Sequence, residues 1–395
     1  MESWDVIVVG AGPGGSATAY YLARGGAKVL LLDRSEFPRD KTCGDGLTPR
    51  AVAVLRDMNL LDDLRQVGCA IGRFEVVAPN GNRTGSSLSV ANDSACGALV
   101  VPRHILDERI LRRAVEVGAE FRGGTGVTEV LPDTNGVRVV RGGGQASETL
   151  RARCVVLATG ATSRLLLQTG ILKRAPKVMV ATRAYFEGVS GLDDAWSIYF
   201  NGVPMPGYGW VFPTGPDSAN IGAGYLAADK LHSSKHAFDE FLGSGPIREM
   251  LSAAKQVGPA RGYPLRADFL NSPTYGVRTL VVGEAAGLVN PMTGEGIDYA
   301  LESGGIAARE ILAMLHADDF SRQRMKDYDR ALRRRFARKF RFCLAVRALC
   351  MHRRRLNLLV GLANRRASLR DRLVKIVLGG SPALEQEPGL SSPVR

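Results

Sequence analysis

The order of apolar and polar residues predicts that the chain begins with a β-α-β unit. Residues 5–9 and 28–33 are apolar runs typical of buried parallel strands, and residues 17–24 between them have a helical pattern. The same reasoning predicts a helix starting at Thr48-Pro49, a helix over 103–117 and antiparallel strands at 127–131, 137–141 and 148–157. The first part of the chain therefore belongs to the α/β class.

The second half changes to a strand-rich pattern and then returns to the first one. Strand signals with aromatic residues and Gly/Pro turns fall at 178–186, 196–200, 209–212 and 220–225, before a buried strand at 279–283 and an amphipathic helix at 297–315. We therefore expect a discontinuous Rossmann-like domain with an inserted antiparallel β-sheet domain for the substrate. The expected ranges are 1–175 with 275–318, 176–274, a basic helical segment over 319–378 and a flexible tail over 379–395.

A glycine turn separates the first strand from its helix. Gly10, Gly12 and Gly15 have the Gly-x-Gly-x-x-Gly spacing, which permits a tight turn, a close pyrophosphate and close packing of helix on strand. Asp33, 23 residues after Gly10, is placed to accept a hydrogen bond from an adenosine ribose hydroxyl. The pattern predicts dinucleotide binding, and a glycine turn that only packs is the alternative.

A second glycine cluster follows the strand at 279–283. Glu284 is able to hydrogen-bond a polyol such as ribityl, and the Gly294–Gly296 turn opens a helix whose amides would stabilise negative charge on a reduced flavin. Two sites on one domain, from opposite ends of the chain, favour FAD over NAD, although a second tight turn with a helix cap is the alternative. Because no other Gly-x-Gly-x-x-Gly opens a helix, we expect NADPH or another reductant to dock transiently, or a protein or quinol to donate electrons.

Longer motifs carry a resemblance to a known family. They are FPRDKTCGDGLTPRAV at 37–52, PGYGWVFP at 206–213 and GEAAGLVNPMTGEGIDYALESG at 283–304. With the glycine turn, and over about residues 1–315, the chain resembles the geranylgeranyl reductase family of FAD enzymes, within the wider p-hydroxybenzoate hydroxylase fold. Polyprenyl and menaquinone side-chain reductases are the most similar members. The resemblance implies a glutathione-reductase-type FAD domain and reduction of C=C bonds in an isoprenoid lipid.

The resemblance also implies roles for individual residues. The AMP half of FAD would lie on Gly10, Gly12, Gly14, Gly15, Asp33 and Arg34, its pyrophosphate on Arg103, and its ribityl and isoalloxazine half on Gly283, Glu284, Gly294 and Gly296. Cys43 would lie near the flavin, and Tyr208 and Trp210 would line an apolar substrate channel. The chain departs from the family where Glu284 and Thr159 stand at positions that usually hold Asp.

Each candidate outside the flavin motifs has a structural alternative. Cys43 is the candidate proton donor, and Asp45 is a second candidate that would donate or relay the proton, with water as a third source. A small residue in a tight loop and a turn-stabilising aspartate are the respective alternatives. Tyr208 and Trp210 alternate along one strand and so share a face, which is equally typical of a protein core.

The net charge of +13 is concentrated in one segment. Residues 320–380 contain 19 Lys and Arg against three Asp, a net of +16, which leaves −3 for the rest of the chain. Arginine-rich helices with an apolar stripe suit an anionic membrane surface, and a helical cap on the main body is the alternative. No nucleic-acid recognition module accompanies the charge, so we do not expect nucleic acid as a partner.

Cysteine spacing and hydropathy address the compartment. Six scattered cysteines without a Cys-x-x-Cys argue against a disulfide framework or a thiolate zinc site. The first strand leads directly into the glycine turn without a signal-peptide pattern, and no run of about 18 apolar residues occurs. We expect a cytoplasmic protein that the basic segment would hold at the inner face of the membrane. The sequence leaves its oligomeric state open.

Three functions follow from these patterns. The leading hypothesis is an FAD-dependent reductase of isoprenoid C=C bonds, with hydride from reduced flavin and a proton from the protein or water. The alternative is an FAD-dependent monooxygenase, an epoxidase or hydroxylase acting on an apolar natural product, because the same scaffold supports both chemistries. A lipid- or partner-binding flavoprotein that depends on the basic segment is the non-enzymatic alternative.

Overall fold

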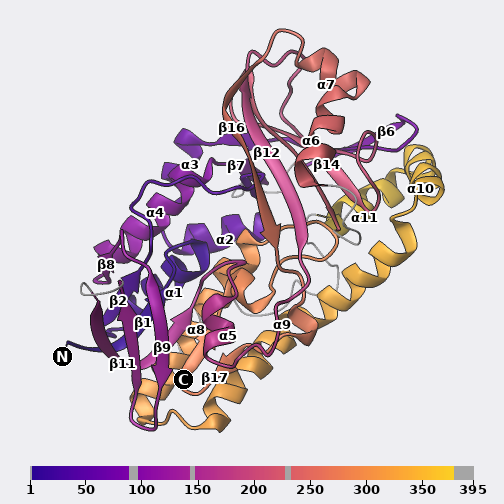
Figure 1. Ribbon diagram of the computed structural model, residues 1–395. Helices are drawn as coiled ribbons and strands as arrows, with labels where there is room; N and C mark the ends of the chain where they lie inside the picture. Colours follow the sequence, from indigo (N-terminus) through magenta and orange to yellow (C-terminus); the bar gives the residue numbers. More distant parts are fainter. Residues whose placement is uncertain (1, 89–96, 143–146, 227–232, 378–395) are drawn as a thin grey trace. The chain divides into compact units, whose positions relative to one another are not determined.

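The computed structural model describes residues 2–88, 97–142, 147–226 and 233–377, which form two compact units (Figure 1). Unit 1 contains Met1–Asp40, His104–Lys177 and Arg266–Cys343. Unit 2 contains Lys41–Arg103, Val178–Leu265 and Leu344–Arg395. The expected tail over 379–395 lies outside the described residues.

Unit 1 is built on a mainly parallel sheet of eight strands. Its order is β17-β18-β11-β1-β2-β8, with β10 on β11 and β9 on β10. The strands are β1 (Ser3–Val9), β2 (Val29–Leu32), β8 (Glu120–Arg122), β9 (Val127–Pro132), β10 (Val137–Arg141), β11 (Glu148–Leu157), β17 (Tyr275–Gly276) and β18 (Thr279–Val281). The antiparallel excursion of β9, β10 and β11 is as expected, and the buried apolar runs of β1 and β2 explain their central place.

Five α-helices accompany this sheet: α1 (Pro13–Arg24), α4 (Arg103–Glu116), α5 (Arg164–Gln168), α8 (Ile297–Ala317) and the first part of α9 (Arg322–Cys350). Gly304 lets α8 approach α1, because a Cβ at this position would lie 2.7 Å from the carbonyl oxygen of Gly14. Helix α9 buries an apolar face, on which Phe336 and Phe340 contact Tyr299 and Tyr328 donates a hydrogen bond to the carbonyl oxygen of Val281 at 2.7 Å.

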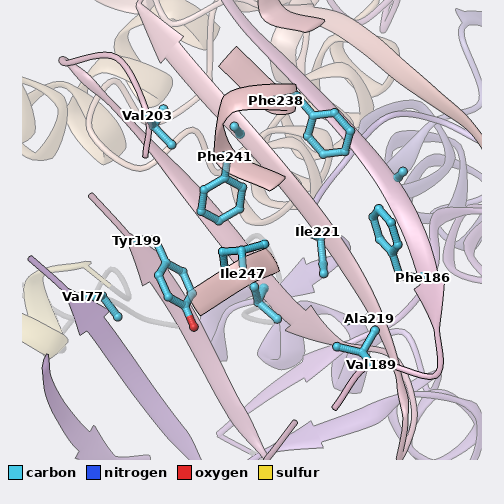
Figure 2. Packing of buried hydrophobic residues seen from close by; sticks show 13 residues of the cluster. Val77, Phe186, Val189, Tyr199, Val203, Ala219, Ile221, Phe238, Phe241 and Ile247 are labelled. Carbon is cyan, nitrogen blue, oxygen red and sulfur yellow. The ribbon is translucent and has the colours of Figure 1, made fainter. Parts of the chain in front are cut away.

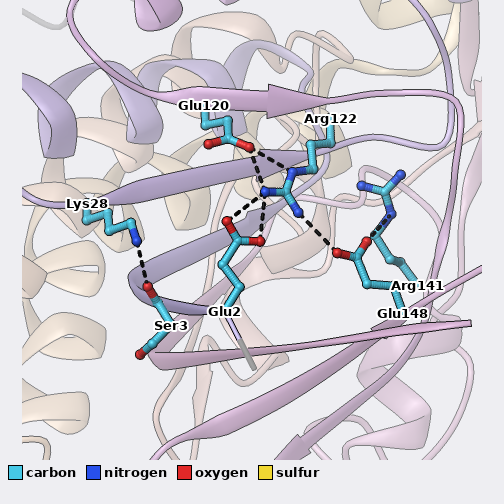
Figure 3. A network of polar contacts seen from close by, with 7 residues as sticks. All are labelled: Glu2, Ser3, Lys28, Glu120, Arg122, Arg141 and Glu148. Atoms are coloured by element: carbon cyan, nitrogen blue, oxygen red, sulfur yellow. Dashed lines mark hydrogen bonds and ion pairs between the residues drawn. The ribbon is translucent and has the colours of Figure 1, made fainter.

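A network of surface ion pairs and hydrogen bonds connects residues of the unit 1 sheet, as Figure 3 shows. Arg122 on β8 donates to Glu2 at 2.8 and 2.9 Å, to Glu120 at 2.8 Å and to Glu148 at 3.1 Å. Arg141 reaches Glu148 at 3.6 Å, and Lys28 Nζ donates to the Ser3 carbonyl at 3.0 Å. The network links strand ends that are far apart in sequence, although solvent-exposed ion pairs of this kind stabilise only modestly.

Unit 2 is built on a seven-stranded sheet in the order β16-β12-β15-β14-β13-β5-β6, in which only the β13–β5 pair is parallel. Its strands are β5 (Arg73–Val77), β6 (Arg83–Ser87), β12 (Met179–Glu187), β13 (Ala195–Tyr199), β14 (Gly207–Pro213), β15 (Ser218–Leu226) and β16 (Lys255–Leu265). A small sheet of β3 (Gly46–Leu47), β7 (Ala98–Val100) and β4 (Cys69–Ile71) lies beside it in the chain. The helices are α2 (Pro49–Asp57), α3 (Leu61–Val67), α6 (Ser234–Gly243), α7 (Gly245–Met250), α10 (Arg353–Arg365) and α11 (Ala367–Val377).

Helices α6 and α7 cover one face of this sheet, and Figure 2 shows the core that their side chains form with those of the sheet. Phe238, Phe241 and Ile247 pack against Ile221 of β15 and Tyr199 of β13. Burial of each large apolar side chain contributes roughly 1.5–3 kcal/mol. A Cβ at Gly209 would lie 2.3 Å from the Phe241 ring, so this glycine of the PGYGWVFP motif lets the helix approach the strand.

The two units differ from the ranges expected from the sequence. Residues 41–103 belong to unit 2, because β5 pairs with β13 and thereby extends the seven-stranded sheet. Residues 319–343 belong to unit 1, because α9 buries its apolar face there. Among the described residues, no helix combines the length and apolar character needed to cross a membrane.

Candidate functional site

The glycine turn of unit 1 has a backbone conformation that leaves no room for a Cβ atom at Gly10 or Gly15. Gly10 has φ +106°, and a Cβ added there would lie 2.4 Å from the carbonyl oxygen of Ala158. A Cβ at Gly15 would lie 1.7 Å from the carbonyl oxygen of Gly10. Gly12 is the N-cap of α1, and no side chain caps this helix. The first-turn amides are therefore available to an anion.

Asp33 holds the glycine turn from the end of β2. Its Oδ2 accepts a hydrogen bond from the Ala11 amide at 2.7 Å, and its Oδ1 accepts one from the Ser35 amide at 2.9 Å. Each carboxylate oxygen has a further lone pair for a ligand hydroxyl. Arg34 beside it is exposed. The ribose role expected for Asp33 stays a prediction, but its structural role in fixing the turn is visible.

The second glycine cluster is held by a buried arginine that the sequence patterns did not indicate. Arg266 is fully buried, and its guanidinium donates to the carbonyl oxygen of Ala285 at 2.5 Å and to Asp268 at 3.1 Å. Its backbone amide donates to Glu284 Oε1 at 3.3 Å, so the half-buried Glu284 side chain is oriented by the same residue. The Glu284 side chain, for which the resemblance implied an Asp, therefore has a backbone amide partner.

The turn before α8 is stabilised by a second missed residue. Asn290 is fully buried, and its side-chain Oδ1 accepts hydrogen bonds from the backbone amides of Met292 and Thr293 at 2.9 and 3.3 Å. Its backbone amide donates to the Glu295 carbonyl oxygen at 2.7 Å. Gly294 has φ +71°, and Gly296 is the N-cap of α8, which no side chain caps. A second helix N-terminus therefore presents its amides.

The two glycine clusters lie together in unit 1 although they are far apart in sequence. A Cβ added at Gly14 would lie 3.5 Å from the Ala300 Cβ, and one added at Gly283 would lie 3.1 Å from the same atom. The Gly283 amide also donates to Ser303 Oγ at 2.9 Å, which ties the cluster to α8. Two uncapped helix N-termini and a hydrogen-bonded carboxylate within one unit fit a long dinucleotide such as FAD. Thr159 donates to the Thr162 carbonyl at 2.8 Å, a local contact within its turn.

The loop containing Cys43 and Asp45 lies in unit 2, against an aromatic face of the seven-stranded sheet. A Cβ at Gly46 would lie 1.7 Å from the Trp196 ring, and one at Gly44 would lie 2.9 Å from the Phe212 ring. These contacts explain the Cys-Gly-Asp-Gly sequence, because only glycine lets the rings pack directly on the backbone. Cys43 is a half-buried free thiol, and Asp45, at φ +64°, is fully buried.

Asp45 is the centre of a buried polar cluster. Its Oδ2 accepts hydrogen bonds from the Tyr185 hydroxyl at 2.6 Å and from Asn220 Nδ2 at 2.8 Å. Its Oδ1 is buried without a partner among the described residues. Burial raises the pKa of Asp45 to about 6, against the lowering effect of the Tyr185 and Asn220 hydrogen bonds and of the charges of Arg183 and Arg103. The carboxyl is therefore able to hold a proton close to neutral pH.

Asn220 joins this cluster to the PGYGWVFP motif. Its Nδ2 donates to the Cys43 carbonyl at 2.7 Å as well as to Asp45, and its Oδ1 accepts from Trp210 Nε1 at 3.0 Å. Trp210 is therefore committed to a buried hydrogen bond. Tyr208, Trp210 and Phe212 share one face of β14, as the alternation predicts, and Tyr208 is half-buried.

The structure thus separates the expected site residues between the two units. Unit 1 contains the glycines expected to hold FAD, with Asp33, Arg34 and Glu284. Unit 2 contains Cys43, Asp45, Tyr208, Trp210 and Arg103, the last almost fully buried at the first position of α4. Arg103 is close enough to Asp45 to act on its charge. Its expected pyrophosphate contact stays a prediction.

Comparisons with known proteins agree with this geometry. A family model described as an FAD binding domain matches residues 3–342. The chain is 35% identical over 333 residues to a menaquinone reductase of Mycobacterium tuberculosis, covering 78% of this chain and 76% of that one. It is 31% identical over 331 residues to a digeranylgeranylglycerophospholipid reductase of Methanopyrus kandleri, covering 82% of this chain and 84% of that one.

A solved structure shares the fold over nearly the whole chain. It is a geranylgeranyl bacteriochlorophyll reductase-like protein of Thermoplasma acidophilum, with a TM-score of 0.84 at 23% identity, covering 97% of this chain and 98% of that one. At this identity the likeness concerns the fold alone. The expected fold class, an α/β FAD-type domain with an inserted sheet and a helical C-terminal region, is confirmed.

Proposed function

Because this chain belongs to the FAD binding domain family, as a geranylgeranyl reductase-like FAD-dependent oxidoreductase, we propose that it saturates C=C bonds of an isoprenoid lipid. The substrate class we infer is a geranylgeranyl or polyprenyl chain or a menaquinone side chain. The observation that carries this proposal is the 35% identity to a menaquinone reductase over 78% of the chain. The FAD cofactor expected from the two glycine clusters is confirmed by the family match.

In this proposal the residues of unit 1 bind and orient FAD. The amides at the N-terminus of α1, opened by Gly10, Gly12, Gly14 and Gly15, hold the pyrophosphate. Asp33 and Arg34 hold the AMP half, Gly283 and Glu284 the ribityl chain, and the α8 amides after Gly294 and Gly296 the ring. When bound and reduced, FAD supplies the hydride, and NADPH or another reductant supplies its electrons.

The residues of unit 2 handle the substrate and the proton. The half-buried Tyr208 and the aromatic face around Trp210 are suited to an apolar chain, and exclusion of water there would protect the reaction. Asp45, and Cys43 in the same loop, are the candidate sources of the proton that the substrate takes up. The burial of Asp45, which raises its pKa to about 6, supports this assignment.

Flavin spectroscopy without oxygen tests the reaction class. Protein loaded with FAD is reduced with dithionite under nitrogen and mixed with menaquinone or a geranylgeranyl lipid in detergent. A reductase is expected to regain the oxidised flavin spectrum as the lipid is reduced. Reoxidation that requires oxygen, together with a product that gains an oxygen atom, would replace the proposal with the monooxygenase alternative.

We also infer that helix α10 contacts an anionic membrane surface. Its inner face buries Leu356, Val360 and Ala363, and Asn364 Nδ2 donates to the Arg83 carbonyl at 2.8 Å, so the helix is anchored within unit 2. Its outer face leaves Leu358 65% and Leu362 39% exposed, one turn apart.

The positive charge around this outer face favours an anionic membrane surface as its partner. Exposed arginines flank the two leucines, namely Arg353, Arg354, Arg355, Arg365 and Arg366. Basic residues near an anionic leaflet contribute about 1 kcal/mol each, and the exposed leucines add apolar contact. By contrast Phe336 and Phe340 of α9 are buried in unit 1, so these two apolar residues of the 320–380 segment do not contribute to this contact.

Vesicle sedimentation tests the membrane contact. The double variant Leu358→Ser/Leu362→Ser is expected to reduce binding to phosphatidylglycerol vesicles by about tenfold or more, because two apolar side chains are lost. Val277→Ser, which changes a 63% exposed residue of unit 1, should bind as the wild type does. Equal binding to neutral phosphatidylcholine vesicles, or no effect of the double variant, would contradict the inference.

A further inference from the structure

The Asp45 carboxyl has only one route outward through its described hydrogen bonds. Two side chains donate to it within the described part of unit 2, Tyr185 at 2.6 Å and Asn220 at 2.8 Å. Asn220 is fully buried, and both its amide hydrogens are used, by Asp45 and by the Cys43 carbonyl. Tyr185 is half-exposed. A proton leaving Asp45 along these bonds therefore passes through the Tyr185 hydroxyl.

The short separation allows the proton to lie on either oxygen. At 2.6 Å between oxygens, the bond can run from the tyrosine hydroxyl to a carboxylate, or from a carboxylic acid to the tyrosine oxygen. In the second arrangement the tyrosine hydroxyl hydrogen is directed elsewhere. Tyr185 then donates to a new acceptor while Asp45 stands behind it as the acid.

Positive charge favours the state that remains after the proton has left. The Arg183 guanidinium lies 4.3 Å from the Tyr185 ring centroid, on the same strand, and is itself almost fully buried. Arg183 from β12 and Arg103 from α4 are the charged groups that act on Asp45, and Tyr185 and Asn220 complete its polar surroundings. Low-dielectric surroundings strengthen the attraction between these cations and a newly formed anion.

We propose that Tyr185 is a further catalytic residue, the acid that protonates the substrate carbon, and that Asp45 restores its proton. This inference rests on the proposed function. In the step, the Tyr185 O–H bond breaks and a C–H bond forms at one alkene carbon, and the hydride that the other carbon takes up would come from reduced FAD when it is bound. The Asp45 proton moves to the tyrosine oxygen, leaving a carboxylate that Arg183 and Arg103 stabilise, and solvent returns the proton between turnovers.

Asn220 acts in this relay as a positioning residue. Its side chain is oriented by the indole of Trp210 at 3.0 Å, and it holds the Cys43 carbonyl and the Asp45 carboxyl in one loop geometry. Because the amide itself has no transferable proton near neutral pH, it fixes the distance between Asp45 and Tyr185 rather than carrying charge.

The relay is tested by Tyr185→Phe, with Tyr199→Phe as the matched control in the same sheet. Tyr199 lies on β13 in the core cluster covered by α6 and α7. General acid catalysis typically contributes 10²- to 10⁴-fold, so we expect kcat for isoprenoid reduction to fall by roughly that factor in Tyr185→Phe. The KM and the FAD content of Tyr185→Phe should stay within about twofold of those of Tyr199→Phe, and both variants should remain folded.

Infrared spectroscopy gives a readout that does not depend on turnover. Wild-type minus Asp45→Asn difference spectra isolate the protonated carboxyl band of Asp45. Because the Tyr185 hydrogen bond lowers the pKa of Asp45, Tyr185→Phe should keep this band to higher pH than the wild type. An unchanged band and titration would overturn the shared proton.

The outcomes separate the relay from the proposed function. Wild-type protein that binds FAD but reduces no isoprenoid lipid contradicts the proposed function, and the infrared titration then decides the Asp45–Tyr185 proton link by itself. Active wild type with a Tyr185→Phe kcat within about threefold of the control overturns the relay alone. If Tyr185→Phe does not fold, Asp45→Asn must lose the same kcat, and wild-type activity in that variant overturns the relay.

Discussion

The glycine turn of unit 1 and the Cys43–Gly46 loop of unit 2 each place an aspartate beside a backbone that only glycine permits. Asp33 accepts backbone amides on both oxygens, from Ala11 and Ser35. Asp45 accepts only from side chains, on one oxygen, while the other is buried without a partner among the described residues. The first arrangement holds a shape for a ligand, and the second favours a proton on the carboxyl.

The largest effect is expected from breaking the glycine turn. Gly15→Ala places a Cβ 1.7 Å from the carbonyl oxygen of Gly10, so the turn or α1 must shift. We expect FAD binding to weaken by about 3 kcal/mol, roughly a hundredfold, as measured by FAD titration of the apoprotein. Gly361→Ala in α10, where no atom lies within 4 Å of the new Cβ, is the control and should bind FAD normally. Equal FAD affinity in the two variants would contradict the role of the turn.

The second effect distinguishes Asp45 by its pH dependence. Burial raises the pKa of Asp45 to about 6, above its ordinary value of 3.8, so as the pH rises the unfolded chain loses this proton first. The contribution of the Asp45 carboxyl to the free energy of unfolding is therefore fully present below about pH 4. It declines by about 3 kcal/mol as the pH rises to about 6. Denaturant unfolding at several pH values should show this decline in the wild type relative to Asp45→Asn. Parallel pH curves for the two proteins would show that the carboxyl is not a proton store.

The third effect tests whether the PGYGWVFP motif supports the Asp45 loop. Trp210→Phe removes the donor to Asn220 Oδ1 and leaves a buried acceptor unsatisfied. Trp196→Phe removes a similar volume, but the indole nitrogen of Trp196 has no partner among the described residues. We expect Trp210→Phe to cost about 1–3 kcal/mol more in the free energy of unfolding than Trp196→Phe. It should also raise the reactivity of Cys43 toward a thiol reagent, and equal values would disconnect the motif from the loop.

The smallest effect is expected at the surface network of unit 1. Arg122→Ala removes hydrogen bonds to Glu2, Glu120 and Glu148, all of them solvent-exposed. Exposed ion pairs contribute about 0–1 kcal/mol each and are screened by salt, so the loss should be about 1 kcal/mol and smaller in high salt. Thermal unfolding at two salt concentrations checks this. A loss as large as that of Trp210→Phe would mean that exposed and buried hydrogen bonds contribute equally to the free energy of unfolding.

Local patterns were sufficient for most of unit 1. The apolar runs of β1 and β2, the Gly10–Gly15 spacing and the amphipathic α8 are local signals, and the structure contains these elements, although α1 begins at Pro13 rather than at residue 17 as predicted. Asp33 was found because its distance from the glycines is short and regular. The glycines of the second cluster were visible for the same reason, since tight turns and helix starts have local signatures.

The buried cluster of unit 2 could not be predicted in this way. Asn220 lies 175 residues from Asp45 in the sequence, and Tyr185 lies 140 residues away. They meet because β12 pairs with β15 and both face the Cys43–Gly46 loop, which is a result of strand order rather than of local spacing. Arg266 was missed for a similar reason, because a buried arginine has no sequence signal until its acceptors are placed. The assignment of 41–103 to unit 2 likewise depends on the non-local β5–β13 pair.

The central claim, that this FAD enzyme reduces isoprenoid double bonds, is tested most directly by the mass of the lipid product. FAD-loaded protein reduced by dithionite is incubated under nitrogen with menaquinone or a geranylgeranyl lipid, and the extracted lipid is analysed by mass spectrometry beside Gly15→Ala. The account predicts a gain of two hydrogen atoms for each reduced bond with the wild type and little or none with the variant. Lipids of unchanged mass after incubation with FAD-loaded wild type would contradict it.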